Sequence, residues 1–557
     1  MKNFSYWKFN NSLCNDKLYI DQMKTNIQIW KKELSSEIKD KRVLWDFMKM
    51  KIRSFTQDYS KRIAKERRQK IEVLEKEVQD LEKQLVGCAN DSLVERLELK
   101  RKELQNCYDY INQGLKVRSR ASWYENGERN PQFFNQLLKS NKNKSVIRKL
   151  YVNGDEISHD GREILKQINL FYSRLYTRVE VSRSNLDFLP HTLPKLSDDS
   201  KKLCEGTIVE RECLNALDQM MLNKSPGNDG LSVEFYKTFW PVIGDMVIAS
   251  LNEAFQIGEL AASQKQAVIT LIKKEGKDPL LIKNYRPISL LNVDYKILAK
   301  ILSKRVKNVL DELISPDQVG YIKNRNIGEA IRLIDDMIFH TSINNVPGFL
   351  VAVDFEKAFD SVSHVFLQNV LQAFGFGASF RKWIKILYTN TVSCVLNGGY
   401  STGYFNVERG VRQGDPLSPY LFILCVETLA KVIQNDNLVL GLRFNGTEVK
   451  QVLYADDITL FIQDLDSMSR LDVIFKSFAK VSGLKVNTEK TYIMLLGSSQ
   501  GSICTFPFGK MVPFVKILGV YFSLDVQVKE NMNYKEILSK IKKISLVVEP
   551  KGLNTNG

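Results

Sequence analysis

Histidine and paired cysteines are scarce in this sequence, and their scarcity excludes common kinds of metal and redox site. The 557 residues include four histidines, and the eight cysteines occur singly, without any C-x-x-C pair. A structural zinc site is not expected, because such sites use closely spaced Cys and His ligands. Scattered single cysteines in a long chain indicate reduced thiols in a cytosolic or nuclear setting.

Long apolar runs are also missing. The first eight residues, MKNFSYWK, contain no apolar segment of the kind found in signal peptides. The most apolar stretches, residues 349–353 and 419–429, are far shorter than the roughly 20 residues that a membrane-spanning helix needs. We therefore expect an intracellular protein, in the cytoplasm or nucleus, without a membrane partner.

Acidic residues are fewer than basic ones. Lys and Arg total 80 against 64 Asp and Glu, for a net charge of +16. Such a surplus favours a polyanionic partner, because Lys and Arg that neutralise phosphates release condensed counterions. Charge alone also fits a basic protein with no such partner. The length predicts two to four domains.

The N-terminal region is predicted to be helical. Residues from about 21 to 113 contain no proline and are rich in Lys, Glu, Leu and Gln. An apolar seam with alternating steps of three and four occupies Ile71, Leu74, Val78, Leu81 and Leu85. The helix formers are interrupted at residues 87–91. Because the seam is short and broken, we favour an antiparallel helical hairpin over a coiled-coil dimer.

Arginines and aromatics alternate just after this region, at Arg118, Arg120 and Trp123. Such residues can hold phosphate and stack on bases, which predicts a nucleic-acid contact. A helix with a packed tryptophan would have the same composition. Residues 141–196 then alternate short strand-like pieces with loops, and we interpret them as a variable linker.

Three carboxylates stand at the ends of apolar strands. Asp354 follows the strand predicted at 349–353, and Asp456 and Asp457 form the tip of a hairpin predicted at 452–462. A buried acid is costly unless something neutralises it. A helix N-cap would explain one aspartate, but neither a cap nor a surface turn explains a doublet between apolar strands. Two bound Mg²⁺ ions would explain all three carboxylates. The three carboxylates therefore indicate metal-dependent phosphoryl transfer.

Eight short motifs follow one another in this half of the chain. They are SPGNDG at 225–230, NYRPISL at 284–290, QVGY at 318–321, DFEKAFD at 354–360, RGVRQGDPLSP at 409–419, YADD at 454–457, SGLKVN at 482–487 and FVKILGV at 514–520. Each is weak alone, but the ordered set is specific. Residues 225–524 resemble the reverse transcriptase domain of LINE elements, the non-LTR retrotransposons of the L1-like kind.

The resemblance implies an α+β fold, the fingers and palm of a right-hand polymerase with an antiparallel palm sheet. An all-α extension with a coiled-coil-like hairpin would precede it. The expected division is 1–140 helical region, 141–197 linker, 198–345 fingers and start of palm, 346–524 palm, and 525–557 thumb.

The resemblance also implies roles for matching residues. Asp354 and Asp456 would hold two Mg²⁺ ions, with Asp457 as an accessory carboxylate, and Lys490 would donate a proton to pyrophosphate. The nucleotide's triphosphate would contact Lys273 or Lys274 together with Arg286, and Gln413 would contact the nucleotide beside Gly410 and Gly414. The activity would be RNA-directed DNA polymerisation, with template RNA, a DNA primer and deoxynucleoside triphosphates as partners.

Phe359 is expected to be the steric gate. Its ring would fill the space that a ribose 2′-hydroxyl needs, so deoxynucleotides would be preferred; a plain core aromatic is the alternative. Phe359 and the YADD tip also argue against a viral RNA-dependent RNA polymerase.

The ends of the chain depart from the family. The sequence before residue 198 has no room for the family's endonuclease, and about 33 residues follow Leu524. A helix predicted at 534–544 would begin the thumb. We therefore expect a chain without the endonuclease and most of the thumb, with low processivity. The alternative is a truncated RNA-binding remnant that does not polymerise.

Overall fold

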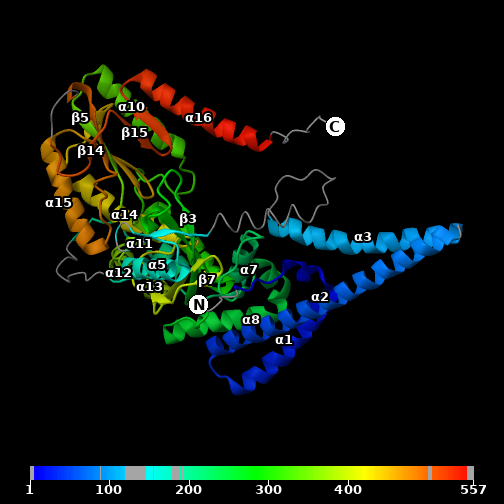
Figure 1. Ribbon diagram of the computed structural model, residues 1–557. Helices are drawn as coiled ribbons and strands as arrows, with labels where there is room; N and C mark the ends of the chain where they lie inside the picture. Colours follow the sequence, from blue (N-terminus) through cyan, green and yellow to red (C-terminus); the bar gives the residue numbers. More distant parts are fainter. Residues whose placement is uncertain are drawn as a thin grey trace, which may run out of the picture.

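The computed structural model describes residues 6–87, 90–119, 146–152, 154, 156–178, 188–190, 192–499 and 505–548. Figure 1 shows a body of packed helices and sheets, from which two long helices project together to one side. The predicted mixture of helix and sheet is confirmed.

Three helices follow the short 3-10 helix η1 (Asn11–Asn15) at the N-terminal end. They are α1 (Lys17–Glu37), α2 (Lys41–Gly87) and α3 (Asp91–Ser119). The predicted long helix is therefore broken twice, and the break before Lys41 was not anticipated. The first half of α2 packs against α1 and against α8 (Val233–Ile257), while its second half and α3 form the projection (Figure 1). There Val78 and Leu81 of the predicted seam are buried with Leu97 of α3.

A five-stranded sheet carries the acidic motifs. Its strand order is β11 (Gln451–Tyr454), β12 (Asp457–Ile462), β5 (Gly348–Val353), β13 (Tyr492–Leu496) and β14 (Lys510–Met511). We call it the acidic sheet. The prediction of an antiparallel sheet holds for four strands and is wrong for β14, which pairs parallel with β13.

A second five-stranded sheet lies beside it. The order is β4 (Tyr285–Leu290), β3 (Gln266–Lys273), β6 (Val392–Asn397) and β7 (Tyr400–Ser401), with β8 (Phe405–Asn406) also on β6. Three two-stranded ribbons complete the strands: β1 (Leu150–Val152) with β2 (Glu156–Ser158), β9 (Leu442–Phe444) with β10 (Thr447–Val449), and β15 (Phe514–Ile517) with β16 (Val520–Ser523).

Helices surround both sheets. They are α6 (Asp198–Cys204), α7 (Glu210–Asp218), α9 (Val293–Lys307), α10 (Ile327–Ile343), α11 (Ala358–Ser361), α12 (His364–Ala373), α13 (Ala378–Tyr388), α14 (Ser418–Asn435), α15 (Leu465–Ser482) and α16 (Val526–Val548), with 3-10 turns η3 (Ile282–Asn284), η4 (Leu310–Glu312) and η5 (Gly497–Ser499). Helix α14 is apolar on nearly every side, as expected of a helix inside a core.

Residues 161–176 correct the linker prediction. They form α5 (Gly161–Tyr176), a helix and not short strand-like pieces. Ile164, Ile168, Tyr172 and Tyr176 are buried at intervals of four, which places them on one face. This face packs against Val395 and Phe405 of the second sheet. The helix is therefore an integral part of the body.

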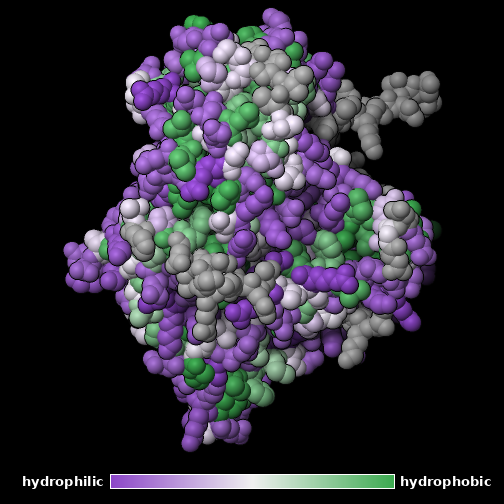
Figure 2. Space-filling view, turned by 90° about the vertical axis from the view of Figure 1, so that its left-hand side faces the viewer, coloured by the Kyte–Doolittle hydropathy of each residue, from purple (hydrophilic) through white to green (hydrophobic). Residues whose placement is uncertain are grey.

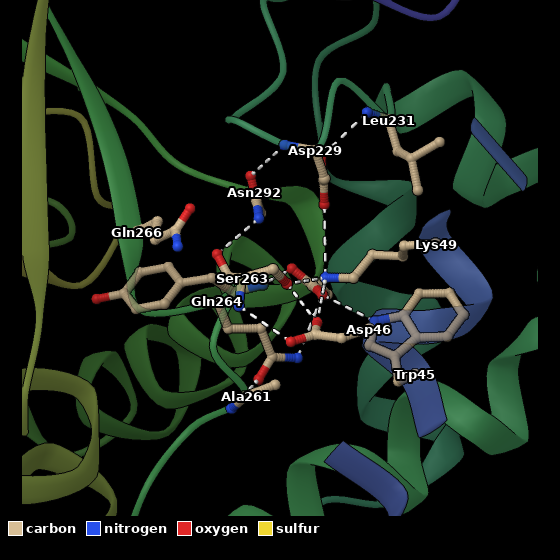
Figure 3. Close-up of polar contacts among 12 residues, drawn as sticks. Trp45, Asp46, Lys49, Asp229, Leu231, Ala261, Ser263, Gln264, Gln266 and Asn292 are labelled. Atoms are coloured by element: carbon tan, nitrogen blue, oxygen red, sulfur yellow. Dashed lines mark hydrogen bonds and ion pairs between the residues drawn. The ribbon is translucent and has the colours of Figure 1, made fainter. Parts of the chain in front are cut away.

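The N-terminal helices share one continuous hydrophobic core with both the acidic sheet and α14. Fully buried Tyr19 and Trp45 belong to the same cluster as Phe422 and Leu460. A buried charge cluster reinforces this junction (Figure 3). Lys49 of α2 lies 2.8 Å from Asp294 Oδ2 and 3.7 Å from Asp229 Oδ2. The N-terminal helices are thus joined to the rest of the body by packing and by charge.

The six described cysteines (14, 107, 204, 213, 394 and 425) are all free thiols. None of the helices within the described ranges is both long and apolar enough to cross a membrane. On the face drawn in Figure 2, hydrophobic residues gather in small groups separated by hydrophilic ones.

Candidate active site

Asp354 is the first residue after the central strand β5, and three neighbours from residues 487–491 hold it. Asn487 Nδ2 donates to Asp354 Oδ2 over 3.1 Å, and the Asp354 N–H donates to Thr491 Oγ1 over 3.3 Å. Lys490 Nζ lies 3.6 Å from the same Oδ2. The loop before β13 therefore fixes the carboxylate from one side and supplies a cation to it.

Asp456 lies at the turn between β11 and β12, beside Asp354. The two strands pair from Tyr454 opposite Asp457 down to Gln451 opposite Leu460, and Ile458 of β12 is opposite Val353 of β5. Ala455 at this turn has φ of 56°, an unfavourable value for a residue with a Cβ. Gln318 Oε1 accepts its N–H over 2.9 Å and so holds the turn in this conformation.

The two carboxylates of the turn repel one another and Asp354. Burial, and then the charge of Asp354, raise the pKa of Asp456 above its ordinary value, and Arg286 opposes the rise. Asp457 is exposed as a residue. Even so, partial desolvation and the charges of Asp456 and Asp354 raise the pKa of its carboxyl to about 6. Carboxylates gathered against their own repulsion form a site that a cation would stabilise.

A cavity of about 730 Å³ opens in front of Asp354 and Asp456. Lys274, Arg286 and Lys490 line it as well. Burial, and then the charges of Lys490 and Arg286, lower the pKa of Lys274, which means that the three cations are close enough to repel one another. Carboxylates and cations therefore line the same cavity, which suits a ligand that carries both metal and phosphate.

Lys273 and Lys274, which the sequence left as alternatives, face different surroundings. Lys273 is exposed at the end of β3 and lies outside the cavity. Lys274 follows it and lines the cavity, because successive residues of an extended chain point to opposite sides. Of the two lysines, Lys274 is therefore the one that faces the cavity.

Phe359, Gln413 and Gly414 lie together on the cavity wall. The Phe359 ring stacks on Phe422 of α14, with ring centroids 4.5 Å apart. Gly414 has φ of 102°, and a Cβ there would come within 3.0 Å of the Ser289 carbonyl oxygen. Ser289 in turn donates its N–H to the Gln413 carbonyl oxygen over 2.9 Å. A glycine at this position lets the motif at 409–419 approach β4 closely.

The remaining predicted residues are Asp457, Arg118, Arg120 and Trp123. Asp457 is at the edge of the hairpin and is not part of the cavity lining. Arg118 is in the last turn of α3. Arg120 and Trp123 fall outside the described residues.

Many residues of the cavity wall were not given a role from the sequence, and four of them have polar or charged side chains that bear on the site. They are Tyr172 of α5, Tyr321, Lys357 and Asp360. Asp360 directly follows the apolar pair Ala358 and Phe359 in the sequence. An acid at such a position was a signal for a buried carboxylate that needs partners. Tyr172 was missed because α5 was not recognised as a helix; the spacing of four from Ile164 to Tyr176 was the signal that could have found it.

The donor set fits Mg²⁺ bound together with a substrate. Among the described residues, no three His, Cys, Asp or Glu side chains converge closely enough to enclose an ion by themselves. Mg²⁺ usually takes one or two carboxylates and completes its octahedron with water and substrate phosphates. Asp354 and Asp456, which both line the cavity, could supply those carboxylates.

Acidic strand ends that face a cation-lined cavity define a class of protein, the metal-dependent phosphoryl-transfer proteins. Comparison with known proteins specifies the family. Residues 272–522 match the family model described as reverse transcriptase (RNA-dependent DNA polymerase). The chain therefore carries a reverse transcriptase domain of the LINE type, as the motifs predicted.

Named relatives agree with this assignment. The Transposon TX1 uncharacterized 149 kDa protein of Xenopus laevis is 34% identical over 94% of this chain and 40% of its own length. The Pol polyprotein from the type-2 retrotransposable element R2DM of Drosophila melanogaster is 25% identical over 62% of the chain and 32% of its own length. The RNA-directed DNA polymerase from the mobile element jockey of the same species is 22% identical over 53% and 32%. The chain thus spans 32% to 40% of the length of these relatives.

Proposed function

We propose that the chain is an RNA-directed DNA polymerase that adds deoxynucleotides to a DNA primer on an RNA template. The observation that carries the proposal is the single cavity that Asp354 and Asp456 line together with Lys274, Arg286 and Lys490. In this proposal residues 198–345 act as fingers and start of the palm, 346–524 as the palm, and 525–557 as the start of a thumb. Residues 1–140 would act as the helical N-terminal region, and residues 141–197, which include the packed helix α5, would join it to the fingers.

The residues of the cavity would divide the work. Asp354 and Asp456, with Asp457 in support, would hold two Mg²⁺ ions, which when bound lower the barrier by activating the primer hydroxyl and neutralising the leaving group. Lys274 and Arg286 would bind the triphosphate of the incoming nucleotide. Lys490 Nζ, 3.6 Å from Asp354, would supply the proton that leaves with pyrophosphate.

Selection of the sugar would fall to Phe359. Its stack on Phe422 leaves the ring little freedom to move aside, so a ribose 2′-hydroxyl would meet a fixed obstacle. Arg118, Arg120 and Trp123 would contribute to binding the template RNA.

Primer extension on an RNA template with Mg²⁺ tests the proposal. We expect the wild-type chain to incorporate deoxynucleotides, and Asp456→Asn to lose incorporation while still binding the template-primer. Asp198→Asn is the matched control, because that carboxylate is 90% exposed and does not line the cavity. RNA binding without extension by the wild-type chain would overturn the proposal and favour a non-polymerising remnant.

A further inference from the structure

Asp360 is a buried carboxylate at the cavity wall, and both of its oxygens are engaged by named donors. Only 3% of the residue is exposed. The Tyr176 hydroxyl donates to Oδ1 over 2.8 Å, and Gln413 Nε2 donates to Oδ2 over 3.0 Å. Asp360 therefore links α5 to the side chain expected to touch the nucleotide.

We propose that Asp360 is a positioning residue that sets the orientation of the Gln413 amide toward the incoming nucleotide, with Tyr176 holding Asp360 in place. This inference rests on the proposed polymerase function. It gives α5 a part in nucleotide binding, although its sequence was interpreted as a linker.

The chemistry of the two side chains carries the proposal. An ionised carboxylate only accepts hydrogen bonds, so the NH₂ end of the Gln413 amide must face Asp360. The amide oxygen and the second N–H are then left to face the cavity. Burial raises the pKa of Asp360 to about 6, and the hydrogen bond from Tyr176 and the charges of Lys357 and Lys274 oppose this rise. The carboxylate is therefore ionised at the pH at which polymerases are assayed.

Hydrogen bonds to main-chain carbonyl oxygens also hold together the three segments that contain Tyr176, Asp360 and Gln413. Glu408 donates its N–H to the Tyr176 carbonyl oxygen over 3.0 Å, and Arg409 Nε donates to the Leu175 carbonyl oxygen over 2.6 Å. Val411 donates its N–H to the Phe359 carbonyl oxygen over 2.7 Å. The last turn of α5 is thus bonded to Glu408 and Arg409, in the loop that leads to Gln413. Phe359, the residue before Asp360, is bonded to the same loop.

Tyr176→Phe is the sharpest test, because it removes one hydroxyl and preserves the stack of this ring on Phe405. In single-nucleotide incorporation we expect the KM for the deoxynucleotide to rise about 10-fold, with kcat changed less than about 2-fold. In a Gln413→Ala background the same substitution should add nothing, because the side chain being positioned is gone. Asp360→Asn should raise KM at least as much, since an amide at 360 lets the Gln413 amide face either way.

Tyr59→Phe is the matched control. The Tyr59 hydroxyl also donates to a carboxylate, Asp16 Oδ2 at 2.7 Å, but it belongs to the N-terminal helices. We expect this control to leave the KM for the nucleotide unchanged, and thermal unfolding will verify that every variant is folded.

Two results would overturn the inference: an unchanged KM in Tyr176→Phe, or an equal rise in KM with and without Gln413. Titration calorimetry, with dTTP added to the protein in the presence of Mg²⁺, measures nucleotide binding without turnover. It is applied to the wild-type chain, Tyr176→Phe, Gln413→Ala and the double variant. If the wild-type chain extends no primer, the proposed function fails, and the Kd values for dTTP still decide whether Tyr176 acts through Gln413.

Discussion

Lys49 of α2 and Asp294 of α9 form an ion pair of 2.8 Å in which both residues are almost completely buried. The same carboxylate oxygen accepts hydrogen bonds from Trp45 Nε1 and Gln264 Nε2. Burial disfavours the charge on Lys49, but the charges of Asp294, Asp46 and Asp229 outweigh it and raise its pKa. One lysine therefore compensates carboxylates from three separate parts of the chain (Figure 3).

Loss of this lysine should be costly. We expect Lys49→Met to lower the free energy of unfolding by about 3–5 kcal/mol, because it leaves buried carboxylates without a cation. Lys51→Met is the control, since Lys51 forms an exposed pair with Glu33 and should cost at most about 1 kcal/mol. Urea unfolding measures both. Similar losses in the two variants would show that the cluster does not support the junction.

Asp229 should make stability depend on pH. Burial raises its pKa to about 7, although Lys49 opposes this rise. Its pKa in the unfolded chain is about 3.9, so between these values the folded state binds the extra proton and stability falls as pH rises. The slope is at most about 1.4 kcal/mol per pH unit for one proton. We expect Asp229→Asn to flatten the stability profile between about pH 4 and pH 7, whereas the exposed control Asp199→Asn should retain it.

Replacement of Phe359 should relax sugar selection. Phe359→Ala removes the ring stacked on Phe422, and we expect ribonucleotide incorporation relative to deoxynucleotide to rise roughly 10- to 200-fold. Phe359→Leu, with a smaller loss of volume, should give an intermediate ratio. Competition between ribo- and deoxynucleotides measures it. A fall in thermal stability with unchanged discrimination would identify Phe359 as a plain core aromatic.

The two neighbouring lysines at the end of β3 provide an internal comparison. Lys274 lines the cavity and Lys273 does not. We expect Lys274→Ala to raise the KM for the nucleotide about 10-fold through loss of a charge-assisted hydrogen bond, and Lys273→Ala to change it less than about 2-fold. Steady-state incorporation assays test the pair. A larger rise in KM for Lys273→Ala than for Lys274→Ala would contradict the assignment of Lys274 to the triphosphate.

Much of the acidic sheet could be predicted from the sequence. The apolar runs around Asp354 and Asp456 predicted strands within one or two residues of β5, β11 and β12. Short, continuous apolar segments bounded by turn residues are typical of buried strands, because they are too short for most helices. The ordered motifs then identified the family, because their sequence along the chain is more specific than any of them alone.

The surroundings of the site could not be predicted in the same way. Helix α5 contains aromatic and β-branched residues such as Ile164, Tyr172 and Tyr176, which favour strands as isolated residues. Their spacing of four was the better guide. The link from Tyr176 to Asp360 joins residues 184 positions apart, and no local pattern encodes such a contact. The charge cluster at Lys49 has the same long-range origin.

The junction at Lys49 also has a consequence for synthesis of the chain. Asp294 follows Lys49 by 245 residues, so at about 5–20 residues per second the lysine waits roughly 10–50 s for its partner to be made. During that interval Tyr19 and Trp45, which end up fully buried, lack part of their core, because Phe239 and Tyr236 of α8 are made much later. Nascent α1 and α2 are therefore a natural client for chaperones at the ribosome, and slow translation through residues 50–294 would prolong their exposure.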